Sequence, residues 1–304
     1  MRLLAALLLA TLVAPASDAR SAPAVRPPAF DGARALRDVE RLVAIGPRPA
    51  GSPGAAQARQ YIVAELKKAG LRARVEPFEV QTPHGRLSMA NVVGVVPGRR
   101  PEVILVGGHY DTKWFSDIHF VGANDGGSST ALLLELARQL GRTTGEYTYW
   151  IAFFDGEEAR ETWTDRDSLY GSRRMATELR RAGRLPRAVL VVDMIGDRDL
   201  GIRREGFSTP WLTELVWGSA TRLGHQAHFL ADRLTVEDDH VPFLKAGVPA
   251  ALLIDFDFPP WHTAADTPDK VSARSLQIVG EVVLDALPAV VARLARGDGA
   301  PRAR

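Results

Sequence analysis

Cysteine is absent from all 304 residues of this sequence, which excludes disulfide bonds, thiolate metal ligands and a lipid-anchored cysteine. Any metal ion must therefore be held by histidine, aspartate and glutamate. A surplus of one charge is missing too, because 38 lysines and arginines stand against 36 aspartates and glutamates, a net charge of +2. This near balance gives no electrostatic reason to expect nucleic acid as a partner.

A membrane-spanning apolar run is also missing. The apolar stretch at residues 3–14 is too short to cross a bilayer, but it follows the basic residue Arg2 and is followed by small residues up to Ala19. These features predict a secretory signal peptide over residues 1–19, with a disordered start as the alternative. We therefore expect a secreted or periplasmic mature protein without stable membrane insertion.

The rest of the sequence contains enough apolar material for one large domain with a single core, since 46% of all residues are hydrophobic and 24% are charged. Residues 20–30, rich in proline and alanine, predict a linker, and residues 299–304 predict a tail. We expect residues 31–298 to form the domain, and the protein to be a monomer.

Helical and strand-like patterns alternate within this predicted domain. Apolar periodicity predicts helices at residues 32–44, 54–69, 127–140, 168–181, 210–223 and 272–294. Strand-like runs lie at residues 72–78, 91–96, 103–108, 147–154, 188–194 and 250–254. This alternation predicts an α/β fold, a three-layer sandwich with a central mixed, mostly parallel sheet flanked by helices. In such sheets, sites form at the carboxyl ends of the strands.

Short motifs rich in acids and histidine lie at or just beyond the predicted strand ends. There are five of them: His109-Tyr110-Asp111, Asn124-Asp125-Gly126, Asp155-Gly156-Glu157-Glu158, Val192-Asp193-Met194 and Trp261-His262-Thr263. Their side chains offer the oxygen and nitrogen ligands that zinc accepts, and a catalytic zinc keeps three protein ligands with one position open. The sequence therefore predicts one metal site with a spare carboxylate beside it.

Two of these motifs have a structural alternative. His109 and Asp111 point to the same side of an extended chain, so Asp111 can orient the imidazole as in many metal sites, although a single histidine after a strand is often structural. Asp125 directly precedes the glycines that begin the helix predicted at residues 127–140. It would therefore either cap that helix or bind a cation.

Glu157 and Glu158 form the most specific pair, because they end an apolar strand where a core seldom places acids. Adjacent carboxylates repel each other unless their environments differ. We expect Glu158 to bind the metal and Glu157, in a dry pocket that raises its pKa, to transfer protons. The alternative is an exposed acidic turn.

Other positions leave both interpretations open. Asp193 ends a strand and His262 lies on a loop. Residues 237–240 fit either a polar turn before a helix or a wall of the site. Trp163 and Trp261 fit either the core or the walls of a small pocket.

The chain resembles the zinc-dependent glutaminyl-peptide cyclotransferases, or glutaminyl cyclases, which share the fold of the zinc aminopeptidases. The likeness spans residues 103–271 and is carried by residues 109–113, 153–159, 167–173 and 237–244, of which the last two segments are the specific ones. It implies a zinc exopeptidase-like fold and cyclisation of N-terminal glutamine in peptides and proteins to pyroglutamate, with release of ammonia.

The resemblance also implies roles for individual residues. Asp125, Glu158 and His262 match the ligands of a single zinc, and Glu157 matches the acid/base that shuttles the proton. Asp193 and Asp238 match acids that support this transfer, and three residues match aromatic pocket positions, namely Trp163, Phe258 and Trp261. Two departures are Leu252, where the animal-type cyclases carry histidine, and the absence of their disulfide near the site.

Two rival functions remain. A secreted aminopeptidase would bind two zincs, one at His109, Asp125 and Asp193 and the other at Asp125, Glu158 and His262, and residues 262–271 resemble that class as well. Glu157 would then activate a metal-bound water for peptide hydrolysis. The second rival is an inactive binding protein on the same fold, against which the presence of every proposed ligand argues.

Overall fold

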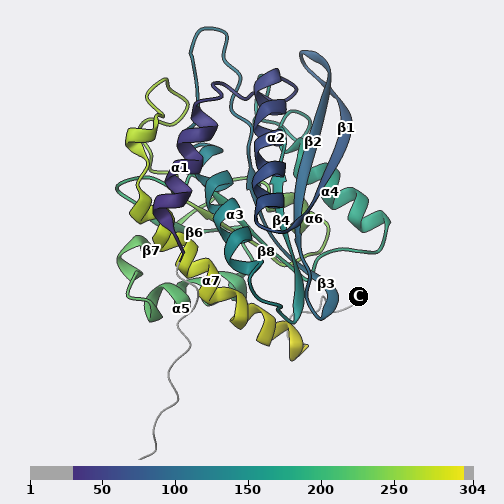
Figure 1. Cartoon of the computed structure of the whole chain (residues 1–304), viewed down its shortest axis with the longest axis vertical. Helices are drawn as coiled ribbons and strands as arrows, with labels where there is room; N and C mark the ends of the chain where they lie inside the picture. The colour runs from purple at the N-terminus through teal and green to yellow at the C-terminus, as the bar shows by residue number, and fades with distance from the viewer. Residues whose placement is uncertain (1–29, 298–304) are drawn as a thin grey trace, which may run out of the picture.

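The computed structural model describes residues 30–297 (Figure 1). The predicted signal peptide, nearly all of the predicted linker and the predicted tail lie outside the described residues. Within residues 30–297, no helix combines the length and apolar character that a membrane crossing needs.

A six-stranded sheet forms the middle layer, with the strand order β1-β2-β4-β3-β5-β8. Its strands are β1 (Arg72–Thr82), β2 (Gly85–Val96), β3 (Arg100–His109), β4 (Tyr147–Phe154), β5 (Ala188–Asp193) and β8 (Ala250–Ile254). β3 pairs in parallel with β4 and β5, and β5 pairs in parallel with β8, whereas β2 pairs antiparallel with β1 and β4. The predicted mixed, mostly parallel sheet is confirmed.

Helices cover both faces of this sheet (Figure 1). One face carries α1 (Gly32–Val43), α2 (Pro53–Lys68), α3 (Gly127–Leu140), α5 (Pro210–Arg222) and α7 (Ala273–Ala295), and the other carries α4 (Tyr170–Arg181) and the short α6 (Val241–Lys245). Successive strand residues point to opposite faces, so Ile104 and Val106 of β3 pack under the first group while Leu105 packs with α4 and α6.

The six predicted helices and six predicted strands are all present, with ends that differ by a few residues in most cases. The sequence pattern missed the first half of β2, the helix α6 and a separate parallel pair, β6 (Ile202–Glu205) and β7 (Phe229–Leu234). Two short 3₁₀-helices, Gln226–His228 and Pro268–Lys270, were also missed. These elements are short or largely exposed, and they carry little apolar periodicity.

The sheet brings three of the five polar motifs to one edge. β3 ends at His109, β4 ends just before Asp155, and β5 ends at Asp193. Because these strands are parallel, their carboxyl ends meet. The other two motifs lie farther from a strand, since residues 124–126 precede α3 and residues 261–263 lie in the loop after β8.

A partly buried ion-pair network joins the helices that cover the first face. Arg138 of α3 contacts Asp38 of α1 (Nη1 to Oδ2, 2.5 Å) and Glu65 of α2 (Nη2 to Oε2, 2.9 Å), and its side chain is 12% exposed. We expect Arg138→Met to lower the free energy of unfolding by about 3 kcal/mol, because buried Asp38 would lose its cation. Urea unfolding measures this. Arg174→Met, which breaks an exposed pair with Glu178, is the control; an equal loss there would contradict the prediction.

A buried acid, Asp255, follows β8. It is 1% exposed and accepts hydrogen bonds from the amides of Gly201 (2.7 Å) and Asp257 (3.2 Å). Burial raises the pKa of Asp255 from 3.8 to about 6 despite these bonds. Between these values the folded protein holds a proton that the unfolded chain has released, so this group lowers stability as pH rises from about 4 to about 6.

The variant Asp255→Asn therefore has a predictable pH signature. Relative to the wild type, its free energy of unfolding should rise between pH 4 and pH 7, by up to about 3 kcal/mol. Chemical unfolding at both pH values measures the difference. Asp257→Asn, which removes an exposed carboxylate from the same loop, is the matched control. A difference that stays constant with pH for Asp255→Asn would refute the assignment.

Candidate active site

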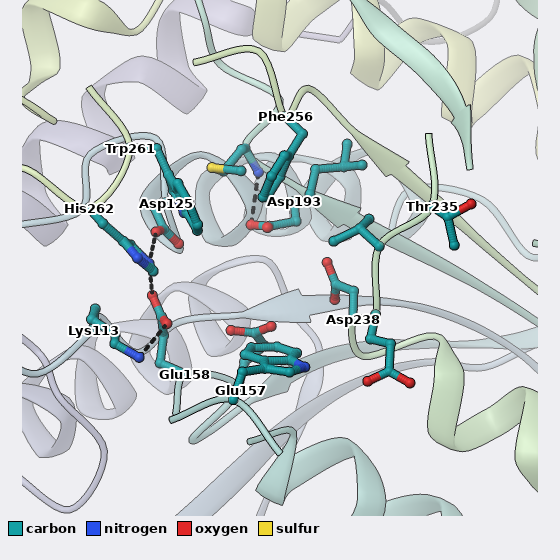
Figure 2. A pocket seen from close by; sticks show the side chains of 15 residues that line it. Lys113, Asp125, Glu157, Glu158, Asp193, Thr235, Asp238, Phe256, Trp261 and His262 are labelled. Carbon is teal, nitrogen blue, oxygen red and sulfur yellow. Dashed lines mark hydrogen bonds and ion pairs between the residues drawn. The ribbon is translucent and has the colours of Figure 1, made fainter. Parts of the chain in front are cut away.

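Asp125, Glu158 and His262 lie together although they come from three separate segments (Figure 2). Their potential ligand atoms are all within 4.8 Å of one another. His262 Nε2 is 3.3 Å from Asp125 Oδ2 and 3.1 Å from Glu158 Oε1. The backbone of His262 is left-handed, with φ of 55°, a conformation that costs free energy for a residue other than glycine and is concentrated at functional sites.

Asp125 does not cap α3. The N-cap is Gly126, whose φ is 76°, and no side chain accepts a capping hydrogen bond there. A Cβ at Gly126 would lie 2.4 Å from the carbonyl oxygen of Asp111, so this tight turn requires glycine. The turn directs the Asp125 carboxylate towards two histidines, since its Oδ1 lies 3.3 Å from His109 Nε2 and its Oδ2 faces His262. The capping alternative is therefore wrong.

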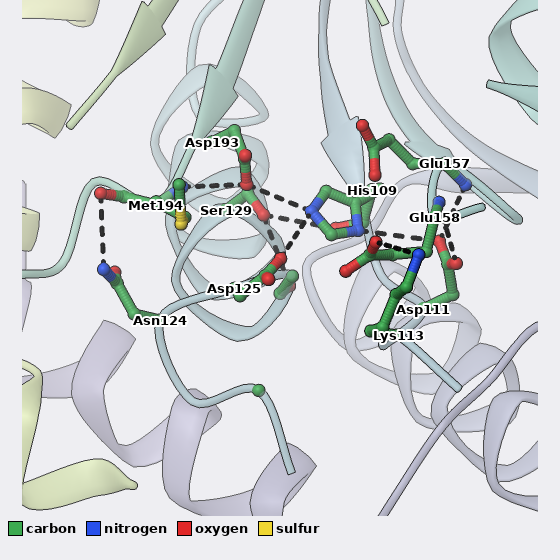
Figure 3. Close-up of polar contacts among 12 residues, drawn as sticks. His109, Asp111, Lys113, Asn124, Asp125, Ser129, Glu157, Glu158, Asp193 and Met194 are labelled. Atoms are coloured by element: carbon green, nitrogen blue, oxygen red, sulfur yellow. Dashed lines mark hydrogen bonds and ion pairs between the residues drawn. The ribbon is translucent and has the colours of Figure 1, made fainter. Parts of the chain in front are cut away.

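A second cluster adjoins the first through the shared Asp125 (Figure 3). The ligand atoms of His109, Asp125 and Asp193 also lie within 4.8 Å of one another, and His109 Nε2 is 3.0 Å from Asp193 Oδ1. On its other side, His109 Nδ1 is 3.5 Å from Asp111 Oδ1. The side chains of His109 and Asp111 thus point to the same side of the chain, as the alternation of side chains along an extended strand predicts.

Asp111 also fixes the backbone of the acid pair. Its carboxylate accepts hydrogen bonds from the amides of Glu157 (3.1 Å) and Glu158 (3.4 Å). This contact ties the turn after β4 to the end of β3. The two glutamates therefore have a defined backbone although they lie outside regular structure.

Glu157 and Glu158 are buried, so the alternative of an exposed acidic turn is wrong. Burial raises the pKa of Glu157 well above 4.5; His109 opposes this, while Asp238 and Glu158 add to it. Burial also raises the pKa of Asp238 well above its usual value, helped by Asp193 and Asp239. A carboxyl group with a raised pKa is suited to accept and return a proton near neutral pH.

The residues Asp125, Glu158 and His262 fit a divalent cation. Burial raises the pKa of Glu158 to about 7, with a further contribution from Asp125, and His262 opposes both. Asp125 Oδ2 is buried, and apart from its ion-pair contact with His262 it has no hydrogen-bond partner among the described residues. Lys113 lies nearby, with its Nζ 3.8 Å from Glu158 Oε2. Two buried carboxylates beside a histidine form the oxygen and nitrogen donor set of a zinc site.

A cavity of about 420 Å³ opens beside these groups. Trp163 and Trp261 line it and are 37% and 40% exposed, so they are pocket walls rather than core residues. Trp261 stacks on His262, with ring centroids 4.1 Å apart, and Phe256 packs against Trp261 at 4.9 Å. Glu157, Asp193 and Asp238 also face the cavity, and Asp238 lies across it from His262 (Figure 2).

Phe258, predicted as a pocket residue, does not line this cavity. It is 4% exposed and packs in the core on the α4 and α6 side of the sheet, together with Leu252 and Ile254. Phe256 occupies the wall instead. Because β8 ends at Ile254, the chain beyond it no longer alternates as a strand, and the pattern could not show which phenylalanine faces the site.

Several cavity residues were not predicted. Lys113, Thr235 and Phe256 line it, and of these only Lys113 had a signal, its place in residues 109–113, which carry the family resemblance. Residues 237–240 combine both expected roles, since Glu237 and Asp238 line the cavity whereas His240 immediately precedes α6.

Comparisons with known proteins agree with this geometry. The model of peptidase family M28 matches residues 91–287, which include both clusters. A glutaminyl-peptide cyclotransferase of Boiga irregularis is 30% identical over 274 residues, covering 77% of this chain and 74% of that protein. The crystal structure of an Acidobacteriales bacterium glutaminyl cyclase has a TM-score of 0.84 and 41% identity, covering 90% of this chain and 100% of that one. The crystal structure of a leucine aminopeptidase precursor from Bacteroides thetaiotaomicron has a TM-score of 0.80 and 25% identity, covering 86% of this chain and 98% of that one.

Proposed function

We propose the reaction of this chain from its family, because the chain belongs to peptidase family M28 and, within it, to the glutaminyl-peptide cyclotransferases. The family expected from the sequence motifs is thereby confirmed. The chain is an enzyme that cyclises the N-terminal glutamine of peptides and proteins to pyroglutamate and releases ammonia. The supporting observation is the position of Glu157, a buried acid that faces the same cavity as the ligand cluster Asp125, Glu158 and His262.

One zinc ion per chain would be held by Asp125, Glu158 and His262. When bound, the zinc supplies Lewis acidity towards the γ-carbonyl oxygen of the substrate glutamine. Two carboxylates and a neutral imidazole suit that ion, and the exposed edge of the cluster leaves a position for the substrate. His262 is the most accessible of the three, with a side chain that is 24% exposed.

The proton transfers fall to this chain's own carboxylates. The α-amine of the substrate forms the new bond to the γ-carbonyl carbon, and Glu157 accepts the proton that the amine loses. Glu157 then returns this proton to the leaving nitrogen as the carbon–nitrogen bond of the side-chain amide breaks. Asp193 and Asp238 face the same cavity and would support the shared proton.

The enzyme also lowers the activation barrier of cyclisation by positioning the substrate glutamine. Nucleophile and electrophile belong to one residue, so the enzyme chiefly has to hold glutamine in a folded conformer. Trp163, Phe256 and Trp261 form apolar walls around the acids, which also keep water away from the reacting atoms. We further propose that the enzyme acts as a monomer outside the cytoplasm, after removal of residues 1–19.

A second candidate function follows from the second cluster. His109, Asp125 and Asp193 could hold another metal ion, and a leucine aminopeptidase precursor is among the similar structures. With two metals, Glu157 would assist hydrolysis of the first peptide bond. The inactive binding protein has no such support, because the proposed ligands and Glu157 face one cavity.

The deciding experiment supplies the zinc-loaded mature chain with a short peptide that begins with glutamine. Cyclisation is expected to reduce the peptide mass by about 17 Da and to release ammonia. The same peptide with N-terminal asparagine is the matched control, because its shorter side chain would have to close a strained four-membered ring. Removal of the intact first residue, extending to peptides with N-terminal leucine, would identify an aminopeptidase instead.

A further inference from the structure

A buried carboxylate outside the cavity collects an unusual number of hydrogen bonds. Glu205, the last residue of β6, is 3% exposed. Its Oε1 accepts from the amides of Phe207 (2.9 Å) and Val236 (3.4 Å). Its Oε2 accepts from the amide of Ser208 (2.7 Å), the hydroxyl of Ser208 (2.8 Å) and His240 Nε2 (3.0 Å). Every partner of this carboxylate is a donor.

Two of these donors flank one of the proposed catalytic acids. Val236 lies two residues before Asp238, and His240 lies two residues after it. Residues 235–238 form part of the cavity wall, and Figure 2 shows Thr235 and Asp238 in it. Glu205 therefore holds the wall at two points, one on each side of Asp238.

The other end of this network is attached to the central sheet. The hydroxyl of Ser208 accepts a hydrogen bond from the amide of Leu252 in β8 (3.0 Å). The next residue, Thr209, donates its amide to the carbonyl of Ala250 (2.7 Å) and accepts from the amide of Ala250 through its hydroxyl (3.1 Å). A continuous set of hydrogen bonds thus runs from the edge strand β8 through Glu205 to the wall that carries Asp238.

The network requires an ionised carboxylate. Burial by itself raises the pKa of Glu205, but the hydrogen bonds from His240 and the backbone lower it to about 2. An ionised carboxylate only accepts hydrogen bonds, which matches its five donors. An amide in the same place would turn an NH₂ group towards one of these donors and leave buried groups unpaired.

We propose that Glu205 is a positioning residue that fixes Asp238 in the cavity by clamping Val236 and His240 to the edge of the central sheet. The inference rests on the proposed function, in which Asp238 supports the proton transfer of Glu157. It assigns a role in turnover to a buried group that does not itself line the cavity. The wall segment lies outside helix and strand, so its place depends on such contacts.

The variant Glu205→Gln tests this role. We expect kcat for cyclisation to fall on the order of tenfold to a hundredfold with KM changed less than about twofold, because displacement of a catalytic group by about 1 Å has costs of that size. The value of kcat should be calculated from the concentration of folded protein that contains zinc. Glu214→Gln, at an exposed ion pair with Arg204, is the matched control. A similar loss in that control, or unchanged kcat in Glu205→Gln, would overturn the proposal.

A double-mutant cycle separates positioning from general damage to the fold. In the background of Asp238→Asn, Glu205→Gln should lower kcat by less than about twofold, since the group that Glu205 positions is already disabled. A loss of equal size in both backgrounds would show that Glu205 acts independently of Asp238. Such additivity would refute the positioning role even if the single variant were slow.

His240 provides a second pair of variants in case Glu205→Gln does not fold. His240→Gln keeps a donor near the position of Nε2 and should retain most of the wild-type kcat. His240→Leu removes the donor, so its kcat should fall as in Glu205→Gln. Equal kcat in these two variants would contradict the clamp.

Hydrogen exchange gives a readout that does not depend on the reaction. The amides of residues 235–240 should exchange faster in Glu205→Gln, or in His240→Leu, than in the wild type. Unchanged exchange overturns the clamp, whereas a wild type without cyclase activity overturns the proposed function.

Discussion

Glu157→Gln is expected to keep its fold and its zinc but to lose turnover by a factor on the order of 10² to 10⁴. The substitution preserves the size of the side chain and removes its ability to accept a proton. In the proposed reaction one carboxylate takes the proton from the attacking amine and returns it to the leaving nitrogen. Because the glutamine side chain cannot accept the proton, both transfers fail in Glu157→Gln.

The environment of Glu157 explains why this loss should be large. The side chain is buried, and its pKa is raised well above 4.5 by burial, with Asp238 and Glu158 contributing and His109 opposing. A free water molecule would be a much weaker base in the same place. Its backbone amide donates a hydrogen bond to Asp111 (3.1 Å), which fixes the point from which the side chain enters the cavity.

The measurement combines turnover of a glutaminyl peptide with metal analysis of the same sample. Glu161→Gln is the matched control, because Glu161 lies on the same loop but its side chain is 59% exposed and pairs with His84. The control is expected to cyclise at the wild-type rate. Wild-type turnover in Glu157→Gln with zinc retained would remove Glu157 from the mechanism.

Much of the fold was predictable because strands such as β5 and β8 are buried on both faces. β5 is buried along its whole length, and such an apolar run between helical patterns indicates a parallel strand in an α/β fold. β7 could not be recognised in this way, since most of its residues are exposed or half-buried. The pair of β6 and β7 is defined by its place beside β8 and not by its composition.

The site was predictable to the extent that it depends on strand ends. His109, Asp193 and the acids after β4 follow apolar runs, so parallel pairing alone brings them together. Asp125 was ambiguous, because an aspartate before a helix usually caps it, and only the left-handed Gly126 turns it towards the histidines. Phe256 rather than Phe258 lines the cavity because of the point at which the chain leaves the sheet after β8, and the sequence pattern does not show that point.

The support behind the site was not predictable from the sequence. Glu205 and His240 are 35 residues apart, and neither carries a local signal that links it to the other. Their contact depends on the edge of β8, on the pair of β6 and β7, and on the turn before α6. A sequence pattern reports the burial of one element at a time, whereas such a network is a property of several elements packed together.

Loss of the proposed zinc should abolish activity, and His262→Ala tests this at the most accessible ligand. The variant removes one of three proposed ligands, so zinc affinity should fall by more than the roughly 10–100-fold typical of outer-shell changes. We expect less than one tenth of the wild-type zinc after dialysis, and a loss of turnover in the same proportion. Its fold should persist, because the side chain lies at the cavity surface and not in the core.

His109→Ala is the matched histidine substitution in the neighbouring cluster, and it decides between one metal and two. If Asp125, Glu158 and His262 hold the only zinc, His109→Ala keeps about one zinc per chain, and one equivalent of zinc restores full activity to chelated wild type. If His109, Asp125 and Asp193 hold a second ion, the wild type contains about two and His109→Ala loses one. The second outcome, together with hydrolysis of leucyl peptides, would replace the cyclase assignment with a two-metal aminopeptidase. Because Asp125 belongs to both clusters, its substitution could not separate them, whereas each of the two histidines belongs to one cluster alone.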